Sequence, residues 1–124
     1  SITGSFIALI DALNKLKKQG MLTKIPIKDF VAATSVGIVD KDVLLDLTYA
    51  EDSKAEVDMN IVMTGKGEFI EVQGTAEGKT FTKKQMDSLL VFAQKGIEEL
   101  VDIERNLFKD ILSAFAAAKG EPRQ

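Results

Sequence analysis

The spacing of apolar residues predicts a helix, four strands and a second, longer helix. From Ser5 to Gln19 the apolar residues recur at helical spacing and form one face of a helix, namely Phe6, Leu9, Ile10, Leu13 and Leu16. Two apolar runs, residues 30–39 and 43–49, then flank a short turn at Asp40 and Lys41, as the strands of a hairpin do. In the register that this turn favours, Val39 pairs with Asp42, so Ile38 lies opposite Val43 and Val36 lies opposite Leu45.

A second hairpin is predicted around the Gly65-Lys66-Gly67 turn. Residues 57–64 alternate between apolar and polar side chains, which is the period of a half-buried strand. Matching apolar residues across the turn pairs Ile61 with Val72 and Met63 with Ile70. A slip by one residue would bury the polar set, so the pattern specifies the register. This register places four polar residues on one face of the sheet: Asp58, Asn60, Glu71 and Gln73.

The last element is a long helix that begins after Thr82. Thr82 and Gln85 have the spacing of a capping box, and Phe81 and Met86 flank it at the positions of a hydrophobic staple. The apolar stripe that follows is Met86, Leu89, Leu90, Ala93, Ile97 and Leu100. We expect Gly96 to allow close packing or to mark a bend, and residues 107–115 to form a second helical piece before a frayed tail.

These elements predict one domain of the α+β class, residues 1–124, with a core over residues 1–103 and a helical extension and tail over 104–124. We expect two layers, with antiparallel strands in one layer and both helices packed on the same face of the sheet. A chain of this length is long enough to bury one hydrophobic core.

Composition narrows the possible chemistry. The chain has neither cysteine nor histidine, so thiolate and imidazole ligands and a histidine base are excluded. No apolar run approaches the roughly 20 residues that span a bilayer, and the lack of cysteine fits a reducing compartment. We therefore expect a cytoplasmic protein without a membrane partner. The net charge is −3, and no basic stripe of the kind typical of a free-standing RNA-binding protein is present.

The negative charge is concentrated in residues 40–60, where seven acids and two lysines give −5 and leave +2 for the remainder of the chain. Asp58 begins a predicted strand, and Asp52 lies in the loop that leads into it. Mg²⁺ typically takes one or two protein carboxylates and completes its shell with water and phosphate oxygens. These two aspartates are therefore candidate ligands for Mg²⁺ or Mn²⁺. The alternative from the residues alone is a solvated acidic loop.

Several motifs resemble the ribonuclease PH family of phosphate-dependent 3′→5′ exoribonucleases, which trim tRNA precursors. The resemblance is to the C-terminal half of that family. It covers nearly the whole chain and becomes weak only after Ile103. The motifs are the opening Ser1-Ile-Thr-Gly-Ser-Phe, Ser35-Val-Gly-Ile-Val, Glu51-Asp-Ser with Asp58-Met-Asn, and Glu71-Val-Gln-Gly-Thr-Ala-Glu-Gly78. The resemblance implies the fold of the second domain of ribosomal protein S5, incomplete without the N-terminal half.

The resemblance also implies a mechanism and site residues. Asp52 and Asp58 match the proposed catalytic and metal-binding aspartates of the family, with inorganic phosphate as the co-substrate that attacks the RNA 3′ end. The sequence leaves open which aspartate binds metal and which acts as a general acid. Asn60, Gln73 and Glu71 are candidate supporting residues. Asp46 is a further candidate, although Thr48 stands where the family usually has a second acid.

Partners are implied in the same way. The arginines with which the family binds phosphate lie in its N-terminal half, so this chain carries the acidic side of the site. We expect it to act as a tRNA nucleotidyltransferase with that half, in a hexameric ring that is a trimer of dimers, and to be inactive alone. The alternative function is a non-catalytic ring subunit of an exosome-like RNA-processing assembly. A third possibility is an acidic binding module without chemistry.

Overall fold

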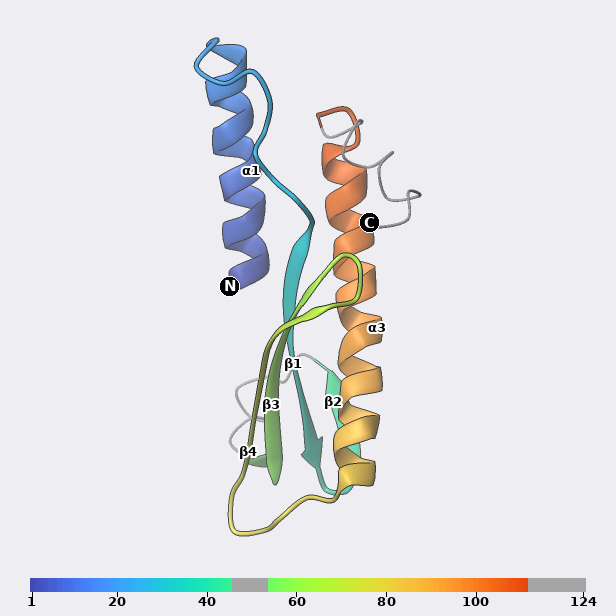
Figure 1. Ribbon diagram of the computed structural model, residues 1–124. Coiled ribbons are helices and arrows are strands. Elements are labelled where there is room, and N and C mark those ends of the chain that lie inside the picture. The colour runs from blue at the N-terminus through green and yellow to red at the C-terminus, as the bar shows by residue number, and fades with distance from the viewer. Residues whose placement is uncertain (46–53, 112–124) are drawn as a thin grey trace.

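The computed structural model describes residues 1–45 and 54–111. Its elements run in the order α1 (Ile2–Lys18), β1 (Val31–Val39), β2 (Asp42–Leu45), β3 (Val57–Thr64), β4 (Phe69–Ala76) and α3 (Lys83–Phe108), as Figure 1 shows. The four strands form one antiparallel sheet in the order β2-β1-β3-β4. The predicted α+β class with an antiparallel sheet is confirmed.

Local sequence explains where both helices begin. The Ser1 hydroxyl accepts a hydrogen bond from the Gly4 N–H at 3.1 Å, which starts α1 a turn earlier than the apolar spacing predicts. The capping box at α3 is confirmed, because Thr82 and Gln85 each accept a hydrogen bond from the other's backbone N–H. Within residues 1–45 and 54–111, no helix is both long and apolar enough to cross a membrane.

The strand registers follow the sequence pattern with one exception. Every pair predicted for β1 and β2 is observed, from Val39 with Asp42 to Val36 with Leu45. In the second hairpin, Ile61 pairs with Val72 as predicted, but Met63 pairs with Phe69 and not with Ile70. A β-bulge between Val62 and Met63 shifts the register at this point. Alternation of apolar residues does not signal the extra residue, because both Phe69 and Ile70 are apolar.

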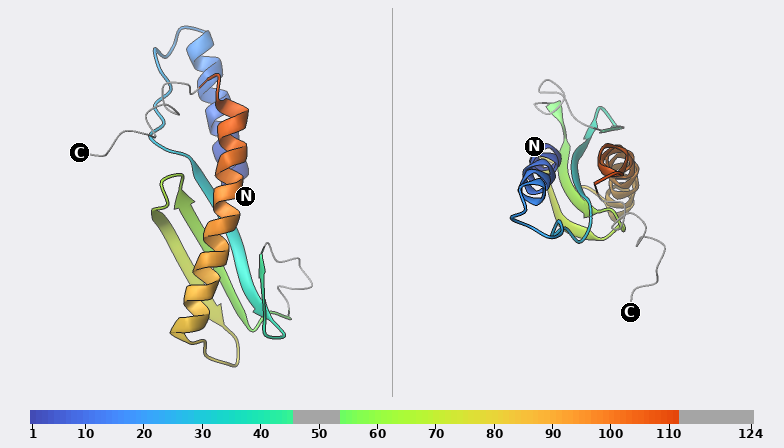
Figure 2. Two further views of the ribbon diagram at one scale, coloured as in Figure 1. Left: turned by 90° about the vertical axis from the view of Figure 1, so that its right-hand side faces the viewer. Right: turned by 90° about the horizontal axis from the view of Figure 1, so that it is seen from above.

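The two helices lie on opposite sides of the sheet, as the right-hand view of Figure 2 shows. Helix α3 covers the face that carries Leu45, and Gly96 permits this close approach because a Cβ atom there would lie 2.9 Å from the Leu45 side chain. The first turn of α1 lies beside the other face, where Ser1 and Ile2 border a hollow together with Asn60. The expectation that both helices share one face therefore does not hold, although the class is as predicted.

The core is one cluster that joins α1, the sheet and α3. Its largest fully buried side chains include Ile10 from α1, Met59 and Ile61 from β3, and Leu89 from α3. Helix α3 continues without a bend past Gly96 to Phe108, whose ring belongs to this core. Of the two alternatives expected for Gly96, close packing is therefore the one observed, and α3 is not interrupted there. The predicted tail beyond residue 111 lies outside the described residues.

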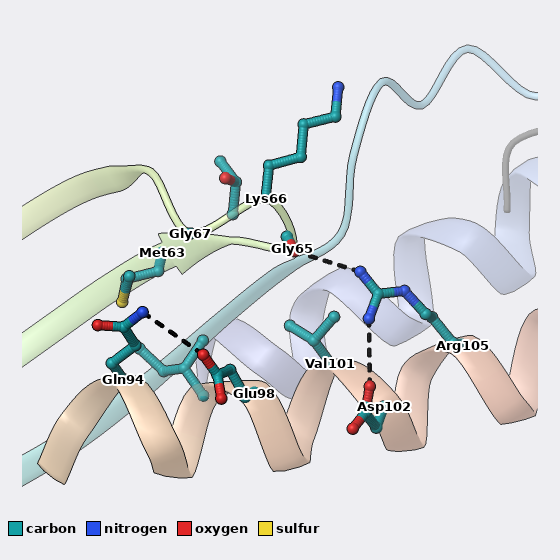
Figure 3. Close-up of a pocket in the computed structure, with 11 residues that line it drawn as sticks. Met63, Gly65, Lys66, Gly67, Gln94, Glu98, Val101, Asp102 and Arg105 are labelled. Carbon is teal, nitrogen blue, oxygen red and sulfur yellow. Dashed lines mark hydrogen bonds and ion pairs between the residues drawn. The ribbon is translucent and has the colours of Figure 1, made fainter. Parts of the chain in front are cut away.

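The turn between β3 and β4 is held against α3 and the start of β1. Figure 3 shows the Arg105 guanidinium donating a hydrogen bond to the Gly65 carbonyl, at 3.2 Å, and pairing with Asp102. The guanidinium also lies 5.3 Å from the centre of the Phe30 ring. The Gly65 N–H donates to the Phe30 carbonyl at 3.0 Å. One arginine therefore connects three elements at the end of the sheet nearest the C-terminal part of α3.

Replacing Gly65 with alanine is expected to destabilise this corner by about 1–3 kcal/mol, because the new methyl group overpacks it. The added Cβ would lie 2.8 Å from Asp29 Oδ1 and 3.1 Å from Arg105 Nη2. Chemical denaturation measures the loss, with the exposed neighbour Lys66→Ala as the control. Equal denaturation midpoints for the two variants would contradict this account of the turn.

Candidate active site

Polar side chains form a strip on the face of the sheet that α3 does not cover. The strip consists of the polar members of three rows of paired residues that cross β1, β3 and β4. These polar members are Ser35, Asp58, Asn60, Glu71, Gln73 and Thr75. The rows are Gly37, Asp58 and Thr75; Ser35, Asn60 and Gln73; and Ala33, Val62 and Glu71. Because side chains alternate between faces, the members of each row point to the same side. The predicted common face of Asp58, Asn60, Glu71 and Gln73 therefore follows from the observed register.

The N-terminus of α1 is fixed beside this strip. Thr3 anchors it, since its hydroxyl accepts a hydrogen bond from the Ala33 N–H at 3.0 Å and donates to the Ala33 carbonyl at 3.4 Å. Ser1 and Ile2 then line a hollow of about 400 Å³ with residues of the strip. The first turn of a helix exposes unpaired N–H groups and the positive end of the helix dipole. The positive end of the α1 dipole therefore lies beside the polar side chains of the strip.

The hollow brings together three of the predicted supporting residues. Asn60 from β3 and Glu71 and Gln73 from β4 all line it. All three are exposed to solvent, whereas Asp58 is half-buried at the beginning of β3. Asn60 and Gln73 are paired directly across the two strands, so their amide groups lie on neighbouring positions of one face.

Two further predicted site residues precede β3 in the sequence. Asp46 and Asp52, together with the neighbouring Glu51, lie outside the described residues. Within the two described segments, no group of three or more His, Cys, Asp or Glu residues has the arrangement of a metal site. Mg²⁺ needs no such group, because one or two carboxylates with water and phosphate oxygens suffice. Asp58 at the end of the polar strip has the right chemistry to be one of those carboxylates.

Sequence reasoning did not identify Ser35 as part of this face. Ser35 lies in the middle of β1, pairs with Asn60, and lines the hollow. Its position in an alternating strand is the local signal, but the pairing of β1 with β3 joins segments distant in sequence. The pairing of β1 with β3 decides which polar residues become neighbours. The spacing of apolar residues within a single hairpin does not predict this pairing.

Comparison with known proteins identifies the family. The sequence pattern described as "3′ exoribonuclease family, domain 2" matches residues 29–96, which is more than half of the chain. The chain belongs to the 3′ exoribonuclease family. Its match to this family includes β1 to β4 and the polar strip, whereas α1 precedes the matched region.

Relatives in the 3′ exoribonuclease family are similar along most of the chain. Ribonuclease PH from Syntrophomonas wolfei is 57% identical over 107 residues, which is 86% of this chain and 45% of that protein. Ribonuclease PH from Bacillus cereus strain G9842 is 54% identical over 114 residues, or 91% of this chain and 46% of that protein. The chain therefore spans about half the length of these relatives. Among solved structures, Rrp46 from rice (Oryza sativa) aligns with a TM-score of 0.46 and 18% identity, covering 90% of this chain and 43% of that one.

Proposed function

We propose that this chain supplies the acidic side of the active site of a phosphorolytic 3′→5′ exoribonuclease that trims tRNA precursors. The observation that carries the proposal is the polar strip beside the N-terminus of α1, within a domain of the 3′ exoribonuclease family. An oxygen of inorganic phosphate attacks the phosphorus of the last phosphodiester. The bond to the 3′-oxygen of the preceding nucleotide breaks, so a nucleoside diphosphate leaves and the shortened RNA ends in a 3′-hydroxyl.

The residues divide this work by their chemistry. Asp58, together with Asp52, would hold Mg²⁺ or Mn²⁺, which neutralises charge on the transferring phosphoryl group when it is bound. One of the two aspartates is the candidate general acid toward the departing 3′-oxygen. Asn60 and Gln73 offer amide donors and acceptors to the scissile phosphate or to the aspartates, with Glu71 beside them. Asp46 remains a further acidic candidate.

The exposed side of α1 supports a partner that resembles the first half of the relatives. Ile2, Leu9 and Leu16 recur every seven residues on this side and are 46%, 49% and 36% exposed. The matched family region is numbered as domain 2 and begins after α1, and the relatives are about twice as long as this chain. An apolar side on a helix indicates a covering partner. We therefore propose that α1 packs against a first domain, which also supplies the cations that bind phosphate and RNA.

The larger assembly is proposed on the same basis. A protein of this family that combines both halves would act as a hexameric ring, a trimer of dimers, and bind the 3′ end of a tRNA precursor. The lack of cysteine fits work in the reducing cytoplasm. These proposals concern the two halves together, and the 124-residue chain alone is expected to be inactive.

Reconstitution tests the proposed function. The chain is mixed with the first half of a relative such as the one from Syntrophomonas wolfei, and 3′-extended RNA, Mg²⁺ and inorganic phosphate are added. We expect shortened RNA and nucleoside diphosphates, and no product when sulfate replaces phosphate. Release of nucleoside monophosphates, or turnover that does not need phosphate, would contradict phosphorolysis. Each half alone is the control for contaminating nucleases.

A further inference from the structure

The side of α1 that packs on the sheet begins with a polar residue. Four residues at the spacing of one helical face form this side, namely Thr3, Phe6, Ile7 and Ile10. The three apolar members belong to the hydrophobic core or pack against it. Thr3 is half-buried. A hydroxyl group that is withdrawn from water needs a hydrogen-bond partner in the protein, so the contacts of Thr3 with the sheet are specific ones.

The partner of Thr3 is the backbone of Ala33 in β1. The Thr3 hydroxyl accepts a hydrogen bond from the Ala33 N–H at 3.0 Å and donates one to the Ala33 carbonyl at 3.4 Å. In the first turn of a helix, a side-chain hydroxyl has no helix carbonyl three or four residues earlier to bind, so it can reach another element. Among the described residues, β3 pairs with residues 31–35 on one side, and no strand pairs with them on the other. Thr3 therefore satisfies backbone groups that a neighbouring strand would otherwise satisfy.

Two kinds of contact hold α1 on the sheet, and they constrain different movements. The Phe6 ring lies edge-on to the Phe30 ring at 6.3 Å between centroids, and Ile10 is fully buried. Apolar burial is not directional, so it tolerates small shifts and rotations of the helix. Hydrogen bonds depend on distance and angle, so those of Thr3 fix the first turn of α1 relative to β1. In Figure 1 the N-terminal end of α1 lies beside the sheet, and its other end extends past the start of β1.

The link between Thr3 and Ala33 lies at the hollow of the candidate site. Ser1 and Ile2, which directly precede Thr3, form one wall of this hollow. Ala33 itself lines the hollow from the sheet, together with Asn60 of the polar strip. Thr3 therefore joins the two walls, and its hydrogen bonds set their separation.

We propose that Thr3 is a positioning residue of the exoribonuclease site, which holds the first turn of α1 at a fixed distance from the polar strip. This role rests on the proposed function, whereas the hydrogen-bonded link to Ala33 does not. Thr3 acts through the residues that line the hollow and need not contact the RNA. A displacement of reacting groups by about 1 Å can lower a rate by about 100-fold, so a short link of this kind has a measurable effect on turnover.

Two substitutions of Thr3 test the proposal in the reconstituted protein. Valine has nearly the shape of threonine but neither donates nor accepts a hydrogen bond, whereas serine keeps the hydroxyl group. The rate constant of a single turnover is measured with protein in saturating excess over 3′-extended RNA. We expect Thr3→Val to lower this rate constant at least about tenfold and Thr3→Ser to retain it within about twofold.

A matched variant separates positioning from stability. Ile97→Val removes one methyl group from a buried side chain of α3, on the other side of the sheet, and so destabilises the fold without touching the hollow. A single-turnover rate constant at saturating protein does not depend on the folded fraction, so Ile97→Val is expected to leave it unchanged. An unchanged rate constant in Thr3→Val, or an equal fall in Ile97→Val, would overturn the proposal.

Hydrogen exchange of the Ala33 amide tests the link without reference to activity. We expect this amide to exchange at least about tenfold faster in Thr3→Val than in the unsubstituted protein and to remain protected in Thr3→Ser. Equal exchange in Thr3→Val and the unsubstituted protein would overturn the proposal. Failure of the proposed function gives a different result. The unsubstituted protein would then release no nucleoside diphosphate while the Ala33 amide still responds to Thr3→Val, and the positioning role would fall with that function.

Discussion

Replacing Asp58 with asparagine is expected to lower the rate of phosphate-dependent nucleoside diphosphate release at least about 100-fold in the reconstituted protein. Asparagine has nearly the same shape but carries no negative charge and cannot donate a carboxylic proton. It therefore removes the metal-binding or acid function and preserves the strand. The rate is measured from single-turnover formation of nucleoside diphosphate on a 3′-extended RNA.

The control for Asp58 is Asp87→Asn in the first turns of α3. Asp87 is an exposed acid whose partner is the Lys83 ammonium at 2.8 Å, and such surface pairs contribute little to stability. This variant is expected to retain the full rate. Raising the Mg²⁺ concentration distinguishes the two roles of Asp58, because a lost ligand is partly compensated by more metal and a lost acid is not. Full activity of Asp58→Asn would show that the acidic side of the site lies elsewhere.

A buried carboxyl group in α3 is expected to make the stability of the fold depend on pH. Glu104 is fully buried, and neither carboxylate oxygen has a hydrogen-bond partner among the described residues. Burial raises the pKa of Glu104 from 4.5 to about 7, and the neighbouring Arg105 charge lowers the pKa by a smaller amount. The folded state therefore binds the proton more tightly than the unfolded state does.

The direction of the effect follows from that difference. Below about pH 4.5 the carboxyl is protonated in both states, and its contribution to stability is fully present. Between pH 4.5 and about pH 7 the unfolded state releases the proton first, so this contribution declines as the pH rises. The total loss is on the order of 3 kcal/mol, at about 1.4 kcal/mol for each pH unit of difference.

Glu104→Gln is expected to remove this dependence, because the amide has a similar shape and does not titrate. We compare the free energy of unfolding of the variant with that of the wild type. The difference, variant minus wild type, should be larger at pH 8 than at pH 5 by on the order of 3 kcal/mol. Urea denaturation at both pH values measures it. The exposed neighbour Glu99→Gln is the control and should show no such change. A difference between Glu104→Gln and wild type that is the same at both pH values would contradict a titrating buried carboxyl.

Some features of the fold are local and can be predicted from short stretches of sequence. The capping box at Thr82 and the pairing of Val39 with Asp42 each depend on residues a few positions apart. The common face of Asn60 and Gln73 depends on strand alternation and one turn. Physical rules for caps, periodicity and turns act over these short distances, and the structure agrees with them.

Other features arise from contacts between distant segments. The bulge beside Met63 and the uninterrupted course of α3 past Gly96 depend on how the turn and the helix meet other elements. Glu104 is a charged residue type, and the sequence pattern predicts that it belongs to a helical extension outside the core. It becomes buried because α3 continues straight along the molecule to Phe108. No local rule places an unpartnered carboxyl in a core.

The sequence by itself determined the class of the fold, the registers of the two hairpins except at the bulge, and the common face of Asp58, Asn60, Glu71 and Gln73. It did so because these properties depend on periodicity and on the chemistry of neighbouring residues. Only the tertiary structure decided that α1 and α3 lie on opposite sides of the sheet, that the N-terminus of α1 meets Asn60 and Gln73, and that Ser35 joins them. These results depend on how segments far apart in the chain pack together, and local patterns carry no information about that packing.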